Sequence, residues 1–108
     1  MKLQCAALAA ALVVAGSAFA QAKVDPKAAE ALMQKSGCVA CHAIDKKVIG
    51  PSYKEVAAKY KVDKGAPAKL AAKVKAGGQG VWGPVPMPPN AQVSDADIKT
   101  LVAWILTL

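Results

Sequence analysis

The segment Cys38-Val39-Ala40-Cys41-His42 contains two of the three cysteines and the only histidine of the chain. With 108 residues, the chain can form one small domain. It is too short for a multi-domain enzyme or for a fold of ~200 residues such as a TIM barrel. Domains of this size often need a disulfide, a bound metal or a similar cross-link in addition to their apolar core. The clustered thiols and imidazole are residues that could form such a link.

The first twenty residues have the pattern of a secretory signal peptide. Lys2 provides a positive start, residues 3–15 are almost entirely apolar, and Ala18 and Ala20 give the small-x-small pattern of a cleavage site. The apolar run is shorter than the ~20 residues that a membrane-spanning helix needs. We therefore expect residues 1–20 to be cleaved, leaving residues 21–108 as one domain in an exported, oxidising compartment without stable membrane insertion.

Four helical segments are predicted in that domain. Their starts carry a side-chain N-cap or an early proline, and their apolar residues recur at helical spacing. The segments run from Asp25 to a stop at Gly37, from Ser52 through Tyr60, from Ala66 to Gly77 and from Ser94 through Leu106. Since no segment shows a convincing alternation of period two, the predicted fold class is all-α.

The Cys-x-x-Cys-His spacing is that of covalent c-type haem attachment. Two thiols three residues apart on a helical turn can each add to a haem vinyl group, and the histidine that follows can ligate the iron. A structural zinc site would need four ligands, whereas residues 21–108 hold two cysteines and one histidine, so a carboxylate would have to complete it. A redox dithiol normally follows a strand, and none is predicted here.

A second axial ligand for the iron must come from elsewhere, and methionine, lysine, water or an open position are the options. Met33 is close to the motif and is expected to fill the core. Met87 lies between prolines in a stretch, residues 77–90, with four glycines and four prolines, a composition typical of a shaped loop or a plain connector. Ligation by His42 and Met87 would favour electron transfer over an enzymatic role. The alternative is a ligand-binding or peroxidatic haem protein with an open distal site.

Three segments, Cys38–Asp45, Gly50–Lys59 and Gly80–Asn90, resemble the small bacterial class I cytochromes c of the cytochrome c-551 type. The similarity covers essentially all of residues 21–108. It implies a periplasmic monomer of four to five helices wrapped around one covalent haem c. It also implies an electron carrier between a membrane quinol-oxidising cytochrome complex and a terminal acceptor, which would be a nitrite reductase or an oxidase.

The resemblance also assigns roles to single residues. Cys38 and Cys41 would form the thioethers, and His42 and Met87 would be the axial ligands. Four further residues would surround the haem. The Pro51 carbonyl would accept the other His42 N–H, the Trp82 indole would donate to a propionate, and the Asn90 amide would lie near the Met87 sulfur. Lys73 stands where relatives often carry an arginine that faces a propionate; it keeps the charge without the bidentate fork.

The net charge of +7 comes entirely from lysines. A nucleic-acid interface is not indicated, because the chain has no arginine and no aromatic residues interleaved with its basic ones. Most of the lysines are expected to keep the surface solvated. Those near the haem edge are expected to steer docking onto acidic surfaces of redox protein partners.

Overall fold

The computed structural model describes residues 24–108, so the predicted signal peptide lies outside the described residues. Within this range the β-type pairings are two isolated bridges, His42–Lys47 and Gly78–Met87. The regular elements are all helical, which confirms the expected all-α class. They are α1 (Pro26–Lys35), the 3₁₀ turn η1 (Cys38–Ala40), α2 (Tyr53–Tyr60), α3 (Ala66–Ala76) and α4 (Asp95–Ile105).

Three of the four α-helices begin at the side-chain N-caps that the sequence predicts. Asp25 Oδ1 accepts a hydrogen bond of 3.0 Å from the backbone N–H two residues later, and Ser94 Oγ accepts one of 3.2 Å from the N–H three residues later. Ser52 and Glu55 cap α2 reciprocally, each side chain accepting a hydrogen bond from the other's backbone N–H at 3.1 and 3.0 Å. These bonds satisfy N–H groups that the first turn of a helix leaves unpaired.

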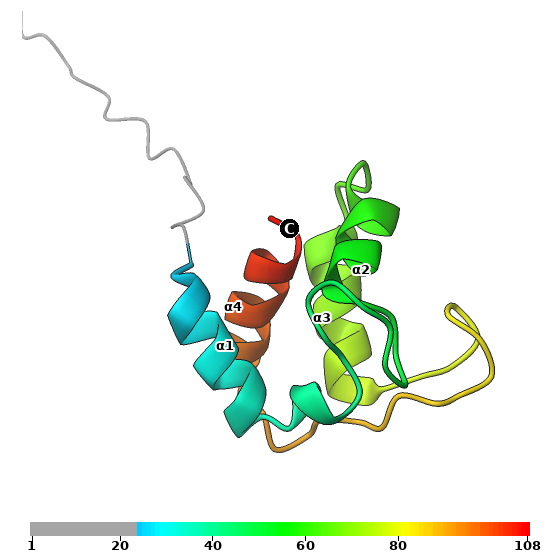
Figure 1. Ribbon diagram of the computed structural model, residues 1–108, viewed down its shortest axis with the longest axis horizontal. Helices are drawn as coiled ribbons and strands as arrows, with labels where there is room; N and C mark the ends of the chain where they lie inside the picture. The colour runs from blue at the N-terminus through cyan, green and yellow to red at the C-terminus, as the bar shows by residue number, and fades with distance from the viewer. Residues whose placement is uncertain (1–23) are drawn as a thin grey trace, which may run out of the picture.

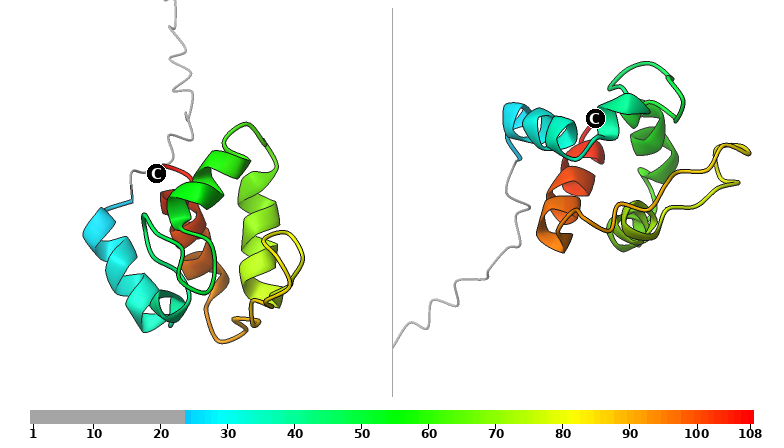
Figure 2. Two further views of the ribbon diagram at one scale, coloured as in Figure 1. Left: turned by 45° about the vertical axis from the view of Figure 1, so that its right-hand side comes forward. Right: turned by 90° about the horizontal axis from the view of Figure 1, so that it is seen from below.

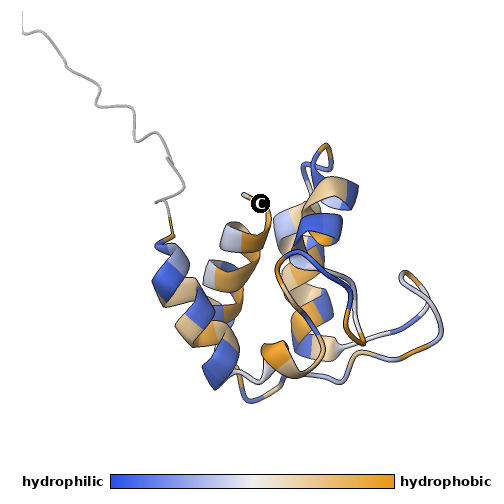
Figure 3. Cartoon of the chain, in the orientation of Figure 1, coloured by the Kyte–Doolittle hydropathy of each residue, from blue (hydrophilic) through white to orange (hydrophobic). Residues whose placement is uncertain are grey.

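Helix α4 is the central element, and α1, α2 and α3 all pack against it (Figure 1). The apolar stripe that the sequence predicts for α4 consists of Ile98, Leu101, Val102, Ile105 and Leu106. All are buried except Leu106, which caps the helix and is only partly buried. Figure 3 shows hydrophobic residues along most of α4, whereas α1 carries hydrophilic patches on much of its surface. The buried residues of α4 are Ile98, Leu101, Val102, Trp104 and Ile105.

The main core cluster lies between α1, α2 and α4. Met33 is 4% exposed within it and packs with Ala29 and Trp104, which confirms its expected place in the core. Residues of α3 pack mainly against a second cluster that contains Ile98 and Val102. Leu70, Ala71 and Val74 of α3 pack against this cluster, and Leu70 and Val74 also line the cavity described below.

Two long loops connect these elements: residues 41–52 lead from η1 to α2, and residues 77–94 lead from α3 to α4 (Figures 1 and 2). The second loop extends well beyond the helices before returning to α4. Between residues 24 and 108 no helix is both long and apolar enough to cross a membrane.

Candidate cofactor site

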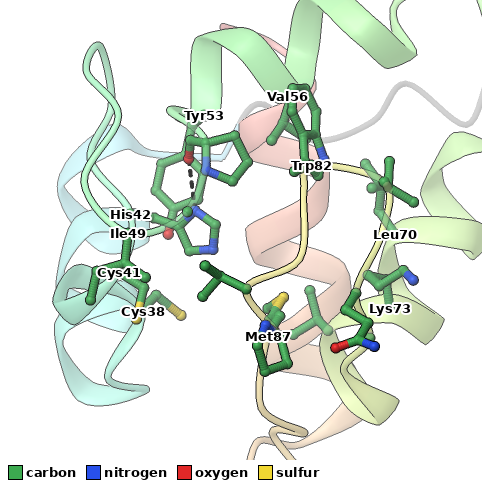
Figure 4. A pocket seen from close by; sticks show the side chains of 18 of the residues that line it. Cys38, Cys41, His42, Ile49, Tyr53, Val56, Leu70, Lys73, Trp82 and Met87 are labelled. Atoms are coloured by element: carbon green, nitrogen blue, oxygen red, sulfur yellow. Dashed lines mark hydrogen bonds between the residues drawn. The ribbon is translucent and has the colours of Figure 1, made fainter.

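One cavity lies between η1 with the loop that follows it, α2, α3, α4 and the loop around Met87 (Figure 4). Its walls are mostly apolar, with side chains such as Ile49, Val56, Leu70 and Ile105. Seven of the eight residues singled out from the sequence line it: Cys38, Cys41, His42, Pro51, Lys73, Trp82 and Met87.

A tight turn after α1 brings the two thiols to the cavity wall. Gly37 has φ 76°, a backbone conformation suited to glycine, and η1 starts directly after it. The backbone N–H groups of Cys41 and His42 donate to the Cys38 carbonyl at 3.2 and 3.0 Å. This single helical turn places both cysteines, each half-buried, beside the imidazole. Burial raises the pKa of the Cys38 thiol, which favours its neutral form.

The His42 ring is oriented by the backbone of the next loop. Its Nδ1 lies 2.8 Å from the Pro51 carbonyl oxygen (Figure 4). A carbonyl oxygen can only accept, so Nδ1 must carry the proton, and Nε2 of the neutral ring keeps its lone pair. An imidazole held in this way is prepared to bind a metal through Nε2.

Two contacts that sequence reasoning did not identify fix the same ring. A Cβ atom on Gly50 would lie 2.6 Å from His42 Cε1, so the ring occupies space that only a glycine leaves open. Tyr53 stacks on the ring, with ring centroids 5.2 Å apart and planes at 21°. Trp104 in turn meets Tyr53 edge-on at 6.1 Å. The Gly-Pro dipeptide at 50–51 was the available sequence signal for the first contact, whereas the stack had none.

Tyr53 therefore connects the imidazole to the hydrophobic core. Burial is the main cause that raises the pKa of its phenol, so the hydroxyl stays neutral at physiological pH. The ring is 4% exposed and belongs to the same core cluster as Trp104 and Leu101. Movement of His42 is thus resisted by packed side chains as well as by its hydrogen bond.

Met87 enters the cavity from the glycine- and proline-rich loop (Figure 4). Its backbone pairs with Gly78 at the end of α3: Gly78 N–H donates to the Met87 carbonyl at 3.0 Å, and Met87 N–H donates to the Gly78 carbonyl at 2.7 Å. The methionine is therefore held at the base of the loop and not at its tip. His42 and Met87, which are 45 residues apart in the sequence, meet at one cavity.

Asn90 is the one predicted site residue that is not among those lining the cavity. Its Nδ2 donates to the carbonyls of Val74 at 3.1 Å and Pro88 at 3.3 Å, and its backbone N–H also donates to Val74 at 3.2 Å. These contacts tie the end of the Met87 loop to α3. The contact between this amide and the Met87 sulfur stays a prediction.

Basic side chains line the cavity or lie close to it. Lys73 and Lys47 line it, and Trp82, which is 42% exposed, covers it from the loop. Lys59 Nζ lies 5.3 Å from the centroid of the Trp82 ring, a cation–π distance. Ammonium and indole N–H groups at the rim of an apolar cavity suit a flat apolar ligand that has an anionic edge.

The donor set fits a covalent haem. Two thiols, an imidazole with a free Nε2 and a thioether are the groups that attach and ligate a c-type haem, and the apolar walls suit a porphyrin ring. Within residues 24–108, no three histidine, cysteine or acidic side chains come together in a way that could hold a metal ion by themselves.

Comparisons with known proteins agree with this geometry. The cytochrome c family model matches residues 26–108. Cytochrome c-551 of Pseudomonas aeruginosa is 53% identical over 100 residues, which cover 93% of this chain and 89% of the relative. Cytochrome c-551 of Allochromatium vinosum is 56% identical over 93 residues, covering 84% and 99%. The crystal structure of wild-type Nitrosomonas europaea cytochrome c552 matches with a TM-score of 0.72 and 53% identity, covering 73% of this chain and 98% of that one.

The family match spans nearly all of the described residues, and the relatives agree with the chain at about half of all positions. Members of this family carry a covalently attached c-type haem and transfer electrons to and from redox partners. The chain therefore belongs to the cytochrome c family, as a small class I electron carrier of the c-551 type.

Proposed function

We propose that this protein is a periplasmic one-electron carrier whose haem is attached through Cys38 and Cys41 and ligated by His42 and Met87. The observation that carries the proposal is that His42 and Met87 reach one apolar cavity from separate loops, each with its backbone or ring held by hydrogen bonds. When bound, the haem supplies an iron that changes its oxidation state by one electron.

The remaining site residues would hold the haem and tune it. The Pro51 carbonyl fixes the His42 ring, which raises the basicity of Nε2 toward iron. Trp82 and Lys73 line the cavity, where their N–H groups would donate to the propionates. Asn90 anchors the loop that carries Met87, and its amide would lie near the Met87 sulfur.

Two protein ligands on the iron explain why the protein would act as a carrier and not as an enzyme. With His42 and Met87 both bound, no coordination position is open to oxygen or peroxide. A thioether also raises the reduction potential relative to a second nitrogen ligand. The chain would then exchange single electrons without making or breaking bonds in a substrate.

The proposed setting is the periplasm, reached through the signal peptide at residues 1–20. There the monomer would take electrons from a membrane cytochrome complex and pass them to a nitrite reductase or an oxidase. Lys46 and Lys47 are exposed on the loop beside the cavity, and an acidic partner surface would complement them. Lys69 and Lys75 contribute less to such a surface, because they pair with Asp63 at 2.8 Å and Asp95 at 3.2 Å.

Visible spectra of the purified holoprotein test the proposal. We expect a covalent c-type spectrum in the reduced state, a far-red methionine–iron band in the oxidised state, and no change in the reduced spectrum under carbon monoxide. Prompt binding of carbon monoxide would instead indicate an open distal site and the ligand-binding or peroxidatic alternative. A colourless protein purified from cells that make c-type cytochromes would contradict both.

A further inference from the structure

Gly77 ends α3 in a backbone conformation that is essentially restricted to glycine. Its φ of 71° and ψ of −166° lie outside the region that L side chains tolerate. Its N–H donates to the Lys73 carbonyl at 2.7 Å, which closes the last turn of the helix. From this point the chain leaves α3 and enters the loop that carries Met87.

The space beside Gly77 is filled by the backbone of the Met87 segment. A Cβ atom on Gly77 would overlap the Met87 carbonyl oxygen, and it would lie 2.8 Å from the Pro89 nitrogen and 2.9 Å from the Pro88 carbonyl carbon. These are main-chain atoms, so they cannot rotate away as the end of a long side chain could. The two backbones can approach this closely only because residue 77 has no side chain.

Hydrogen bonds on both sides of this contact hold the two backbones together. Gly78 exchanges two backbone hydrogen bonds with Met87, at 3.0 and 2.7 Å. Asn90 donates from its backbone and its side chain to the Val74 carbonyl, at 3.2 and 3.1 Å. The Met87–Pro89 segment is therefore held against α3 from both ends and cannot retreat from an added Cβ atom without breaking one of these contacts.

We infer that Gly77 is a positioning residue for the methionine ligand. By leaving room for the Met87–Pro89 backbone against the end of α3, it sets how far the Met87 side chain reaches into the cavity. This inference rests on the proposed role of Met87 as an axial ligand. Gly77 would thus set the geometry of a methionine that lies ten positions later in the chain.

Gly80 provides a matched control within the same loop. Its φ of 98° is also positive, so an alanine there would be strained in the same way. No atom lies within 4 Å of the position of its Cβ. Gly80→Ala therefore imposes the backbone strain without displacing the Met87 segment, whereas Gly77→Ala does both.

The test compares the two variants as oxidised holoproteins. Exogenous imidazole competes with Met87 for iron, so its apparent affinity rises when the methionine is badly placed. We expect Gly77→Ala to bind imidazole about tenfold more tightly than Gly80→Ala. The far-red methionine–iron band of Gly77→Ala should also be weaker, at temperatures well below that at which the protein unfolds. Equal affinities and equal bands in the two variants would overturn the inference, even if Gly77→Ala unfolds at a lower temperature.

Two further variants test whether Gly77 acts through Met87. In a Met87→Ala background, Gly77→Ala should no longer change imidazole affinity, because the residue acts through the methionine. If Gly77→Ala yields no folded holoprotein, Pro89→Gly loosens the backbone that faces Gly77 without adding an atom. Imidazole affinity should then rise several-fold, and an unchanged value would overturn the inference. A wild-type protein that lacks the far-red band and binds carbon monoxide would instead refute the proposed function itself.

Discussion

The Nδ1 atom of His42 lies 2.8 Å from the carbonyl oxygen of Pro51. This contact decides the tautomer of the ring, since the carbonyl can only accept and Nε2 is therefore the nitrogen left to bind iron. The same loop places Gly50 against the ring carbon Cε1, so the hydrogen bond and the packing are set by two consecutive residues. The loop thus orients the His42 ring through both its backbone and its packing.

The contact with Gly50 predicts that Gly50→Ala displaces the imidazole. The new Cβ atom would stand 2.6 Å from His42 Cε1, and the ring, held by Pro51 and Tyr53, has little room to move. We expect a loss of about 1–3 kcal/mol in the free energy of unfolding, as for other overpacked sites. The reduction potential should change as well, because a displaced His42 ring would no longer keep the geometry of its hydrogen bond to the Pro51 carbonyl.

Denaturant titration and potentiometry of the holoprotein measure these two effects. Gly65→Ala is the matched control, because a Cβ atom there meets mainly the ends of the Asp63 and Lys69 side chains. It should cost less stability and leave the potential unchanged. If the potential of Gly50→Ala equals that of the wild type, Gly50 does not orient the ring.

Met87→Ala should open the iron to external ligands and lower the reduction potential, since a thioether favours the reduced state. Carbon monoxide should then bind the reduced protein promptly, and the far-red band of the oxidised protein should be lost. Met33→Leu is the control: Met33 is 4% exposed in the core, so the swap should cost less than about 1.5 kcal/mol and leave the spectrum intact. An unchanged potential and spectrum in Met87→Ala would rule out this ligand.

Local signals in the sequence predicted most of the fold. The N-caps at Asp25, Ser52 and Ser94 and the apolar stripe of α4 appear as expected, because each depends on residues a few positions apart. The spacing of the haem motif likewise placed both thiols and the imidazole at one wall.

Contacts between distant segments could not be predicted in this way. The close approach of Gly77 to the Met87 backbone and the stack of Tyr53 on His42 depend on how loops cross helices, and no periodicity records that. The Asn90 amide illustrates the same limit. The resemblance indicated its neighbourhood, but its hydrogen bonds to Val74 and Pro88 follow from the path of the backbone.

Trp104 links α4 to the haem-binding side of the core. It is 4% exposed, meets Tyr53 edge-on at 6.1 Å and packs in the same cluster as Met33. Truncation to alanine should lower the free energy of unfolding by about 3–5 kcal/mol, measured by denaturant titration. Trp104→Phe keeps an aromatic edge for Tyr53 and should cost distinctly less. Equal losses in the two variants would show that the aromatic contact contributes nothing.

The exposed pair Asp63–Lys69 should make a small contribution to stability that depends on pH. The hydrogen bond from Lys69 at 2.8 Å, aided by the Gly65 N–H, lowers the pKa of Asp63. A carboxyl whose pKa is lower in the folded state stabilises that state above its unfolded pKa of about 3.9, and the gain is lost as the pH falls through the folded pKa.

Asp63→Asn should therefore be less stable than the wild type at neutral pH, and the difference should vanish in strong acid. The pKa of Lys69 is raised by the same hydrogen bond, so the gain is fully present below the unfolded pKa of Lys69 and should disappear as the pH rises through its higher folded pKa. Unfolding titrations from acid to alkaline pH measure the difference. A difference that does not change with pH would mean that the ion pair is not its source.

The lysines beside the cavity should govern the encounter with anionic partners. Lys46 and Lys47 are exposed on the loop between His42 and Pro51, whereas Lys27 lies on α1, which lines no part of the cavity. Hexacyanoferrate(III), an anionic oxidant, and tris(1,10-phenanthroline)cobalt(III), a cationic one, serve as small probes of opposite charge. At low ionic strength Lys46→Gln and Lys47→Gln should each slow oxidation by hexacyanoferrate(III) by about twofold.

The same variants should speed the reaction with the cationic oxidant, and both effects should fade as salt screens the charges over about 10 Å at 0.1 M. Lys27→Gln removes the same net charge far from the cavity, so it separates a local effect from a global one. Equal rates in all three variants would assign the effect to net charge alone. If the rate with hexacyanoferrate(III) does not change with salt, these lysines do not steer docking onto acidic partners. Docking would then depend on the exposed apolar residues Val81, Trp82 and Val85 of the Met87 loop.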